Sequence, residues 1–188
     1  MEIDGFLDSA DPNSTLNALN EIGASIKKEQ EKVFLSKRHI PFSEPINDLN
    51  LGNSGTGARL ILGLISGLGL RSKLVGDSSL SNRPMLRVIK PLIQMGAKID
   101  CSQGTLPLFT IDSKITNNFK YEMPIASAQV KSCLLLAAIA AEKNIKIIER
   151  KITRDHTERM IDYFGGDINF RKKENNIREI DYKFNNLT

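Results

Sequence analysis

The sequence of 188 residues contains no tryptophan, and aromatic residues make up only 6 % of it. Since 40 % of the residues are hydrophobic, we expect an aliphatic core large enough for one sizeable domain. Only two cysteines occur, Cys101 and Cys133, and neither has the paired spacing of a metal site. We interpret them as buried free thiols of a protein from a reducing cytoplasm.

An excess of one charge sign is also missing. Lys and Arg number 26 against 22 Asp and Glu, so the formal net charge is only +4, and the basic residues are scattered. A nucleic-acid surface would need a basic stripe. The apolar stretch at 60–70 is too short to span a bilayer, and the first residues lack the apolar region of a signal peptide. We therefore expect a soluble cytoplasmic protein with anionic small-molecule ligands and no nucleic-acid or membrane partner.

One pattern occurs three times along the chain. An amphipathic helical pattern ends at Gly23, again at Gly96 and again at Gly165, and a strand-like stretch follows each time. These glycines are 73 and 69 residues apart. Glycine suits the left-handed residue that ends a helix and turns the chain into a strand. The repetition predicts three related structural units.

Two further predicted helices, at 57–68 and 130–141, are apolar on nearly every side, which places them in the interior. Strand-like stretches lie between the helices, so we expect the order β-α-β-α-β-β twice, at 46–112 and 119–184. Residues 1–45 supply the closing α-β-β of an incomplete first unit. The sequence thus predicts one α/β domain of repeated units around buried helices.

The outer, amphipathic helices carry their own boundary signals. Pro84 is expected at the first position of one of them. Pro91 should kink this helix or delay its start, because an interior proline is unfavourable. Asp155 followed three residues later by Glu158 resembles a capping box, which would begin the last outer helix.

Both apolar helices begin with small or polar residues, at 52–57 and 126–129. A helix N-terminus presents unpaired N–H groups and about half a positive charge, and glycine lets the backbone approach a ligand. Two such ends that converge would bind anions without a metal. Simple capping by Thr56 and Ser127 is the alternative, and the spacing alone leaves it open.

Two arginines, Arg83 and Arg154, stand at the starts of outer helices. A guanidinium group clamps carboxylate or phosphate bidentately, although an arginine at such a place is otherwise a solvated loop residue. His156 lies in a first turn, where a surface role is commoner than that of a base. No Ser-His-Asp set, phosphate-binding P-loop, dinucleotide fingerprint or zinc spacing appears in the sequence.

Four blocks of the sequence resemble the 5-enolpyruvylshikimate-3-phosphate synthase family of enolpyruvyl (carboxyvinyl) transferases. They are GNSGT at 52–56, GDSSLSNRPM at 76–85, ASAQVKS at 126–132 and TRDHTE at 153–158. They occur in the family's order, and the four together are far more specific than any one of them. The resemblance is strongest from residue 50 to 168.

The resemblance implies an α/β fold in which three β-α-β-α-β-β units pack around buried parallel helices, as one of two such domains that close over the substrates. It implies transfer of the enolpyruvyl group of phosphoenolpyruvate to shikimate 3-phosphate, with release of phosphate, in chorismate and aromatic amino-acid biosynthesis. The reaction of the family passes through a tetrahedral intermediate and needs no metal or organic cofactor.

The motifs also imply binding residues. Those that would contact shikimate 3-phosphate are Ser127, Ala128, Gln129 and Arg154. Those that would contact phosphoenolpyruvate are Gly55, Arg83 and Gln129. The inhibitor glyphosate occupies the phosphoenolpyruvate space in the family, and a glycine at position 55 predicts sensitivity to it. No residue of this chain is assigned as general acid or base.

Two features of the family are expected to lie outside these 188 residues, namely its opening Lys-Ser motif and its second domain. We therefore expect part of a binding site and no turnover from these residues alone. Three other interpretations stay open: a related transferase acting on UDP-N-acetylglucosamine, a non-catalytic binding module, and a subunit that needs a separately encoded partner. The blocks at 126–132 and 153–158 argue against the first of these.

Overall fold

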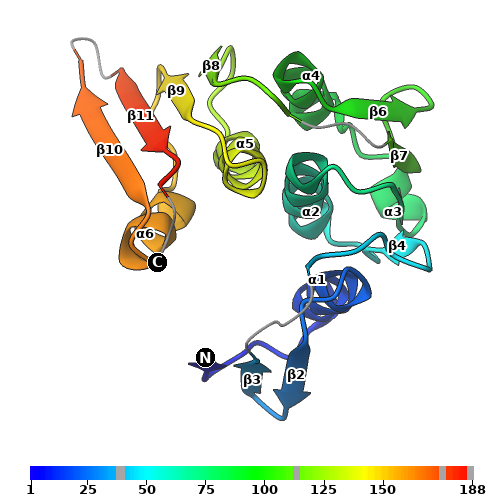
Figure 1. The fold of residues 1–188 in the computed structure, drawn as a ribbon. Coiled ribbons are helices and arrows are strands. Elements are labelled where there is room, and N and C mark those ends of the chain that lie inside the picture. Colours follow the sequence, from blue (N-terminus) through cyan, green and yellow to red (C-terminus); the bar gives the residue numbers. More distant parts are fainter. Residues whose placement is uncertain (37–40, 112–114, 174–176, 186–188) are drawn as a thin grey trace.

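Two apolar helices, α2 (Gly55–Leu68) and α5 (Ala128–Ala140), lie side by side in the interior of the protein (Figure 1). The structure is a computed structural model that describes residues 1–36, 41–111, 115–173 and 177–185. Leu62 on α2 and Leu135 on α5 are fully buried, as the apolar pattern predicts. These two helices form the centre around which the other elements are arranged.

Glycine allows the two central helices to approach each other closely. A Cβ atom at Gly63 would lie 2.3 Å from the carbonyl oxygen of Cys133, and one at Gly67 would lie 2.3 Å from the carbonyl oxygen of Ala137. No side chain fits into either contact. Because the contacts advance together along both helices, α2 and α5 run parallel, and their N-termini lie at the same end.

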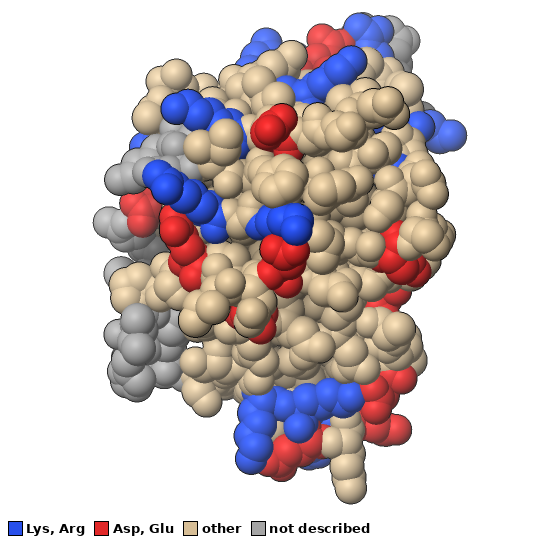
Figure 2. All heavy atoms as spheres, turned by 90° about the vertical axis from the view of Figure 1, so that its right-hand side faces the viewer, with Lys and Arg blue, Asp and Glu red and all other residues tan. Residues whose placement is uncertain are grey.

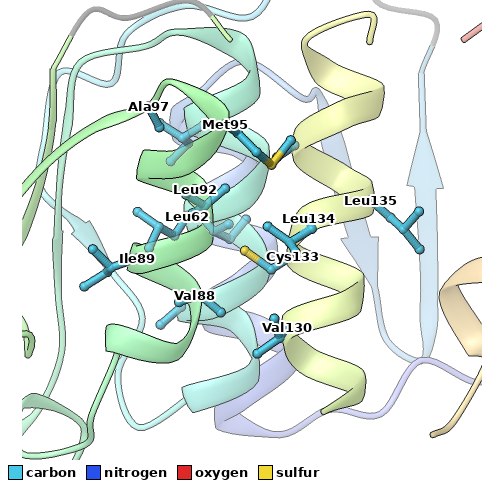
Figure 3. Close-up of a cluster of buried hydrophobic side chains, with 14 of the residues drawn as sticks. Leu62, Val88, Ile89, Leu92, Met95, Ala97, Val130, Cys133, Leu134 and Leu135 are labelled. Atoms are coloured by element: carbon cyan, nitrogen blue, oxygen red, sulfur yellow. The ribbon is translucent and has the colours of Figure 1, made fainter. Parts of the chain in front are cut away.

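A third helix, α4 (Leu86–Met95), packs against this pair and completes the cluster of buried side chains in Figure 3. The cluster is largely aliphatic, as the composition predicts, and contains in addition sulfur-containing side chains and the buried ring of Tyr182. Cys133 lies within it, and burial raises the pKa of its thiol to about 12, so the thiol stays protonated and unreactive. Cys101 is only half-buried, contrary to our expectation.

Two four-stranded sheets flank the helices and follow the same plan. The strands of the first are β4 (Leu49–Asn50), β5 (Ser72–Val75), β6 (Lys98–Cys101) and β7 (Leu108–Ile111), in the order β4-β5-β7-β6. Those of the second are β8 (Phe119–Glu122), β9 (Ile145–Glu149), β10 (Asp167–Lys172) and β11 (Arg178–Lys183), in the order β10-β11-β9-β8. In each sheet the first two strands along the chain are parallel and the other pairs are antiparallel.

A smaller sheet lies beside helix α1 (Ala10–Glu21) and contains β1 (Glu2–Ile3), β2 (Ile26–Glu29) and β3 (Lys32–Leu35), in the order β1-β3-β2. Strand β1 pairs with β3 as β5 pairs with β7 and β9 with β11. The sequence did not predict β1, because a strand of two residues is too short to show periodicity.

The ends of the outer helices agree only partly with the sequence. Gly23, Gly96 and Gly165 all adopt positive φ angles, of 93°, 109° and 79°, as predicted for residues that end helices. The prediction for Pro84 is wrong, since α4 begins at Leu86 and the short helix α3 (Ser78–Ser81) precedes it. Helix α4 continues through Pro91.

The predicted capping box at the start of α6 (His156–Tyr163) is also wrong. Asp155 occupies the N-cap position, but its side chain makes no capping hydrogen bond. Glu158 is fully buried and forms ion pairs with Lys131 and Arg178 instead. Two charged donors hold a carboxylate more strongly than one backbone amide, so the tertiary contacts prevail over the local motif.

Charged side chains of both signs are interspersed on the face shown in Figure 2. Ion pairs occur between exposed side chains of the protein, such as that of Lys73 with Asp48 at 2.6 Å. This face has no continuous basic stripe of the kind that nucleic acids require. Within the parts of the chain that the structure describes, no helix is both long and apolar enough to cross a membrane.

Candidate functional site

The N-terminus of α2 is capped by a serine and begins with a glycine. The Ser54 hydroxyl accepts a hydrogen bond from the amide of Gly57 at 3.0 Å, and Ser54 is buried. Of the two residues named in the capping alternative, Thr56 therefore does not cap its helix. The Thr56 hydroxyl instead accepts a hydrogen bond from the Gln129 side-chain amide at 2.8 Å.

At the N-terminus of α5, the Ser127 hydroxyl accepts from the amide of Val130 at 3.4 Å, as the capping interpretation predicts. A hydroxyl that accepts here still has its own proton to donate, so capping and ligand binding are compatible. The amides of the first turn add their positive partial charge at this end of the helix.

Gln129 joins the ends of the two central helices. Its amide nitrogen donates to Thr56, and its carbonyl oxygen accepts from Nη1 of Arg59 at 3.0 Å. The same Arg59 nitrogen donates to the carbonyl oxygen of Gly55 at 3.0 Å. The side chain of Gln129 is thereby held in one orientation between the two helix N-termini.

Arg59 and Arg83 both approach Gly55. A Cβ atom at Gly55 would lie 3.0 Å from Nη1 of Arg83 and 3.1 Å from Nη1 of Arg59. Gly55 is not among the glycines with positive φ, so its backbone conformation does not require glycine. What requires a small residue is the approach of two guanidinium groups.

Arg83 is held by the loop before α2 and by α3. It donates to the backbone oxygen of Asn53 at 3.3 Å, to the Asn53 side-chain oxygen, and to the Ser79 hydroxyl at 3.4 Å. Asn53 in turn donates to Asp77 at 2.7 Å. This hydrogen bond, together with one from the amide of Leu80, lowers the pKa of the Asp77 carboxyl. Asp77 stays charged and orients Asn53, which orients Arg83.

Arg59 is a site residue that the sequence analysis missed. It is half-buried, and burial lowers the pKa of its guanidinium, as do the positive charges of Arg83 and Arg87. An arginine remains protonated in proteins, so this crowding of like charges attracts an anion. A signal was present in the sequence, because Arg59 is the one charged residue between 55 and 68.

A pocket of about 220 Å³ lies beside this arginine pair, between α2, α5 and the start of α6. The residues that line it are Thr56, Leu60, Ala128, Gln129, Ser132, Arg154, His156 and Thr157. Three of the four residues expected to bind shikimate 3-phosphate therefore come together here, and the fourth, Ser127, precedes Ala128 at the same helix end. Arg154 is exposed, and its guanidinium forms no ion pair with any described residue.

The residues expected to bind phosphoenolpyruvate form a second group, which lies next to this pocket. Gly55 contacts Arg83 as described, and Gln129 reaches this group through Arg59 while also lining the pocket. The two groups of expected binding residues thus lie side by side and share one glutamine. A larger hollow of about 370 Å³, between α5 and α6, is lined by apolar residues such as Leu136 and Phe164 and suits no anion.

The chain resembles known proteins in sequence and in structure. The family model of EPSP synthase (3-phosphoshikimate 1-carboxyvinyltransferase) matches residues 1–180. The 3-phosphoshikimate 1-carboxyvinyltransferase of Lactiplantibacillus plantarum is 46 % identical over 164 residues, which are 87 % of this chain and 38 % of that protein. That of Petrotoga mobilis is 46 % identical over 171 residues, 89 % of this chain and 40 % of the relative.

The fold is also that of a solved relative. The structure of EPSP synthase from Acinetobacter baumannii superposes on this chain with a TM-score of 0.85 at 38 % sequence identity. The matched region covers 97 % of this chain and 41 % of the Acinetobacter baumannii chain. The α/β fold expected from the resemblance is thus confirmed, and the chain spans about two fifths of the length of its relatives. On these matches, the chain belongs to the EPSP synthase (3-phosphoshikimate 1-carboxyvinyltransferase) family.

Proposed function

We propose that these residues bind phosphoenolpyruvate and shikimate 3-phosphate side by side, for transfer of the enolpyruvyl group to the sugar acid and release of phosphate. This reaction serves aromatic amino-acid biosynthesis, by way of chorismate, in the cytoplasm. The observation that carries the proposal is the bridge made by Gln129 between the arginine pair around Gly55 and the pocket that contains Arg154. Two anion-binding regions joined by one polar side chain suit two anionic substrates.

The phosphoenolpyruvate region combines charge with rigid placement. Arg83 and Arg59 present guanidinium groups that are already hydrogen-bonded to Asn53, Ser79, Gln129 and backbone oxygens. Preorganised donors of this kind stabilise negative charge that develops in a transition state, because they need no reorganisation during the reaction. We assign to these two arginines the binding of the carboxylate or the phosphate group of phosphoenolpyruvate.

The shikimate 3-phosphate region combines a helix end with a guanidinium group that has no ion-pair partner in the described parts of the chain. The Ser127 hydroxyl proton and the first amides of α5 are donors for one anionic group, and Arg154 faces the same pocket. Holding both substrates in a fixed relation contributes to catalysis by removing the entropy cost of their encounter. We assign binding and positioning, rather than proton transfer, to the residues of this chain.

Titration with shikimate 3-phosphate, followed by amide NMR of the 188-residue chain, tests this function. We expect a dissociation constant of about 1 mM, equivalent to about 4 kcal/mol for part of a site, with the largest shifts at 126–132 and 153–158. UDP-N-acetylglucosamine serves as the competing ligand and shikimate as the control without phosphate. Shifts elsewhere, or equal binding of the nucleotide sugar, would contradict the proposal. Phosphate release from the same sample tests the expectation that these residues alone do not turn over.

Gly55→Ala is expected to raise the inhibition constant of glyphosate more than the KM of phosphoenolpyruvate, in an active enzyme that contains these residues. The added methyl group would push against both guanidinium groups at about 3 Å, and overpacking of this kind typically costs about 1–3 kcal/mol. The longer inhibitor has less room to adjust than the substrate. Steady-state inhibition kinetics measure the two constants.

Gly57→Ala is the matched control for this variant. A Cβ atom there would lie 2.5 Å from the Thr15 hydroxyl and 2.8 Å from that of Ser54, away from the arginine pair. We expect a lower melting temperature and an unchanged ratio of inhibitor to substrate affinity. If Gly55→Ala behaves in the same way, Gly55 is a structural residue and does not belong to the site.

A further inference from the structure

Four charged side chains are buried beneath the pocket that contains Arg154. The nitrogen Nζ of Lys131 lies 2.6 Å from Oε1 of Glu158 and 3.3 Å from Oε2 of Glu149. Arg178 donates to Oε1 of Glu149 at 2.7 Å and to Oε1 of Glu158 at 2.8 Å. The side chains of Lys131 and both glutamates are fully buried, and that of Arg178 is 10 % exposed. We refer to these four residues as the buried charge cluster.

This cluster connects the two walls of the pocket. Lys131 belongs to α5, two residues after Gln129, while Glu158 belongs to the first turn of α6. Thr153, the residue before Arg154, donates from its hydroxyl to Oε2 of Glu149 at 2.8 Å. The segment that carries Arg154 is therefore tied, through Glu149 and Lys131, to the helix that carries Ala128 and Gln129.

A second connection runs between the same walls. The hydroxyl groups of Ser132 on α5 and Thr157 on α6 lie 2.7 Å apart, and both residues line the pocket. One connection, at Thr153, lies just before Arg154 in the sequence. The others, at Thr157 and Glu158, lie shortly after it. The backbone of Arg154 is thereby fixed, although its guanidinium is exposed and has no ion-pair partner among the described residues.

Stability alone is a weak reason for such a cluster. Burying ions has a desolvation cost that their mutual attraction barely offsets, and well-packed apolar side chains of the same volume are often as stable. The cluster holds two positive and two negative groups and is thus balanced in charge. Its directional hydrogen bonds set the distance between the elements they connect, which apolar contacts do far less strictly.

We propose that the buried charge cluster, acting through the hydrogen bond from Thr153 to Glu149, positions Arg154 relative to the N-terminus of α5 and thereby sets the affinity for shikimate 3-phosphate. Lys131, Glu149, Glu158, Arg178 and Thr153 are positioning residues and do not touch the ligand. The choice of ligand rests on the proposed function, whereas the positioning of the 150–157 segment does not depend on it.

Thr153→Val tests the inference with little change in shape and none in charge. Thr110→Val is its matched control, since the buried Thr110 hydroxyl bonds to the Leu70 carbonyl at 2.8 Å and to the Ser72 hydroxyl at 2.7 Å, in the other sheet. Hydrogen exchange is measured without ligand. We expect amide exchange at 150–157 to become about tenfold faster in Thr153→Val and to stay unchanged there in Thr110→Val. Unchanged exchange at 150–157, or an equal rise along the whole chain, would overturn the inference.

A double-mutant cycle then connects the segment to the ligand. Thr153→Val should weaken shikimate 3-phosphate binding about tenfold when Arg154 is present, and less than about twofold in the Arg154→Ala background. Additive effects would show that the hydrogen bond does not act through Arg154 and would overturn the inference. If the unmodified chain does not bind this ligand, the proposed function fails, and hydrogen exchange still decides whether the cluster positions the segment.

Discussion

Lys131→Met is expected to lower the free energy of unfolding by about 3–5 kcal/mol, which is the scale for breaking a buried ion pair by removal of one partner. Of the described residues, the variant leaves Arg178 as the only charged partner of Glu149 and Glu158, so one negative charge is buried without compensation. Methionine has a similar volume and leaves no large cavity. Urea denaturation followed by circular dichroism measures the loss.

Two further variants separate charge imbalance from packing. Lys73→Met removes a lysine from an exposed pair with Asp48, where the expected loss is at most about 1 kcal/mol. The double variant Lys131→Met/Glu158→Gln keeps the neutral pair of Arg178 and Glu149 and should recover more than half of the loss. If the double variant is less stable than Lys131→Met, charge imbalance is not the cause.

Arg154→Ala is expected to weaken shikimate 3-phosphate binding by about 2–3 kcal/mol, or about 30- to 150-fold. Arg154 lines the pocket, and its guanidinium forms no ion pair with a described residue, so a bound anion would be its first strong partner. Arg154→Lys should recover only part of the affinity, because an ammonium group lacks the planar fork of two parallel donors. Isothermal titration of an enzyme that contains these residues measures the change.

Arg150→Ala is the matched control for this prediction. Arg150 lies in the same segment and has the same charge, but it is exposed and pairs with Glu122 at 2.6 Å. Its loss should change the affinity for shikimate 3-phosphate less than about twofold, through long-range charge alone. Equal effects at positions 150 and 154 would mean that the ligand responds to net charge and that Arg154 makes no specific contact.

Several features of the fold could be predicted because they depend on neighbours along the chain. The apolar residues of α2 and α5 follow one another without a polar face, and such a helix has to be buried. Gly23, Gly96 and Gly165 could be predicted as helix ends because the left-handed conformation there favours glycine locally. Helix starts were harder to predict, as Pro84 and Thr56 show, because several nearby residues can begin a helix equally well.

The residues of the candidate site likewise fall into those that could be predicted from the sequence and those that could not. Gly55, Arg83, Gln129 and Arg154 could be named from motifs at helix ends, and their roles as ligand contacts remain our proposal. Arg59 was not named. As the one charged residue of an apolar helix it stands out in the sequence, but the sequence does not show that it faces Gly55 and Gln129. Glu158 was assigned to a capping box because its partners Lys131 and Arg178 lie 27 residues before it and 20 residues after it.

The repeated pattern, the two buried helices and the helix ends that we propose to bind anions could be inferred from the sequence, since each depends on local periodicity or on one backbone conformation. Only the tertiary structure decided that Gln129 meets Arg59 and Thr56, and that Lys131, Glu149, Glu158 and Arg178 share one buried cluster. The physical reason is that local periodicity shows which face of a helix is buried but not which residue lies opposite it. A buried charge is favourable only beside its partners, and the packing of distant segments brings those partners together.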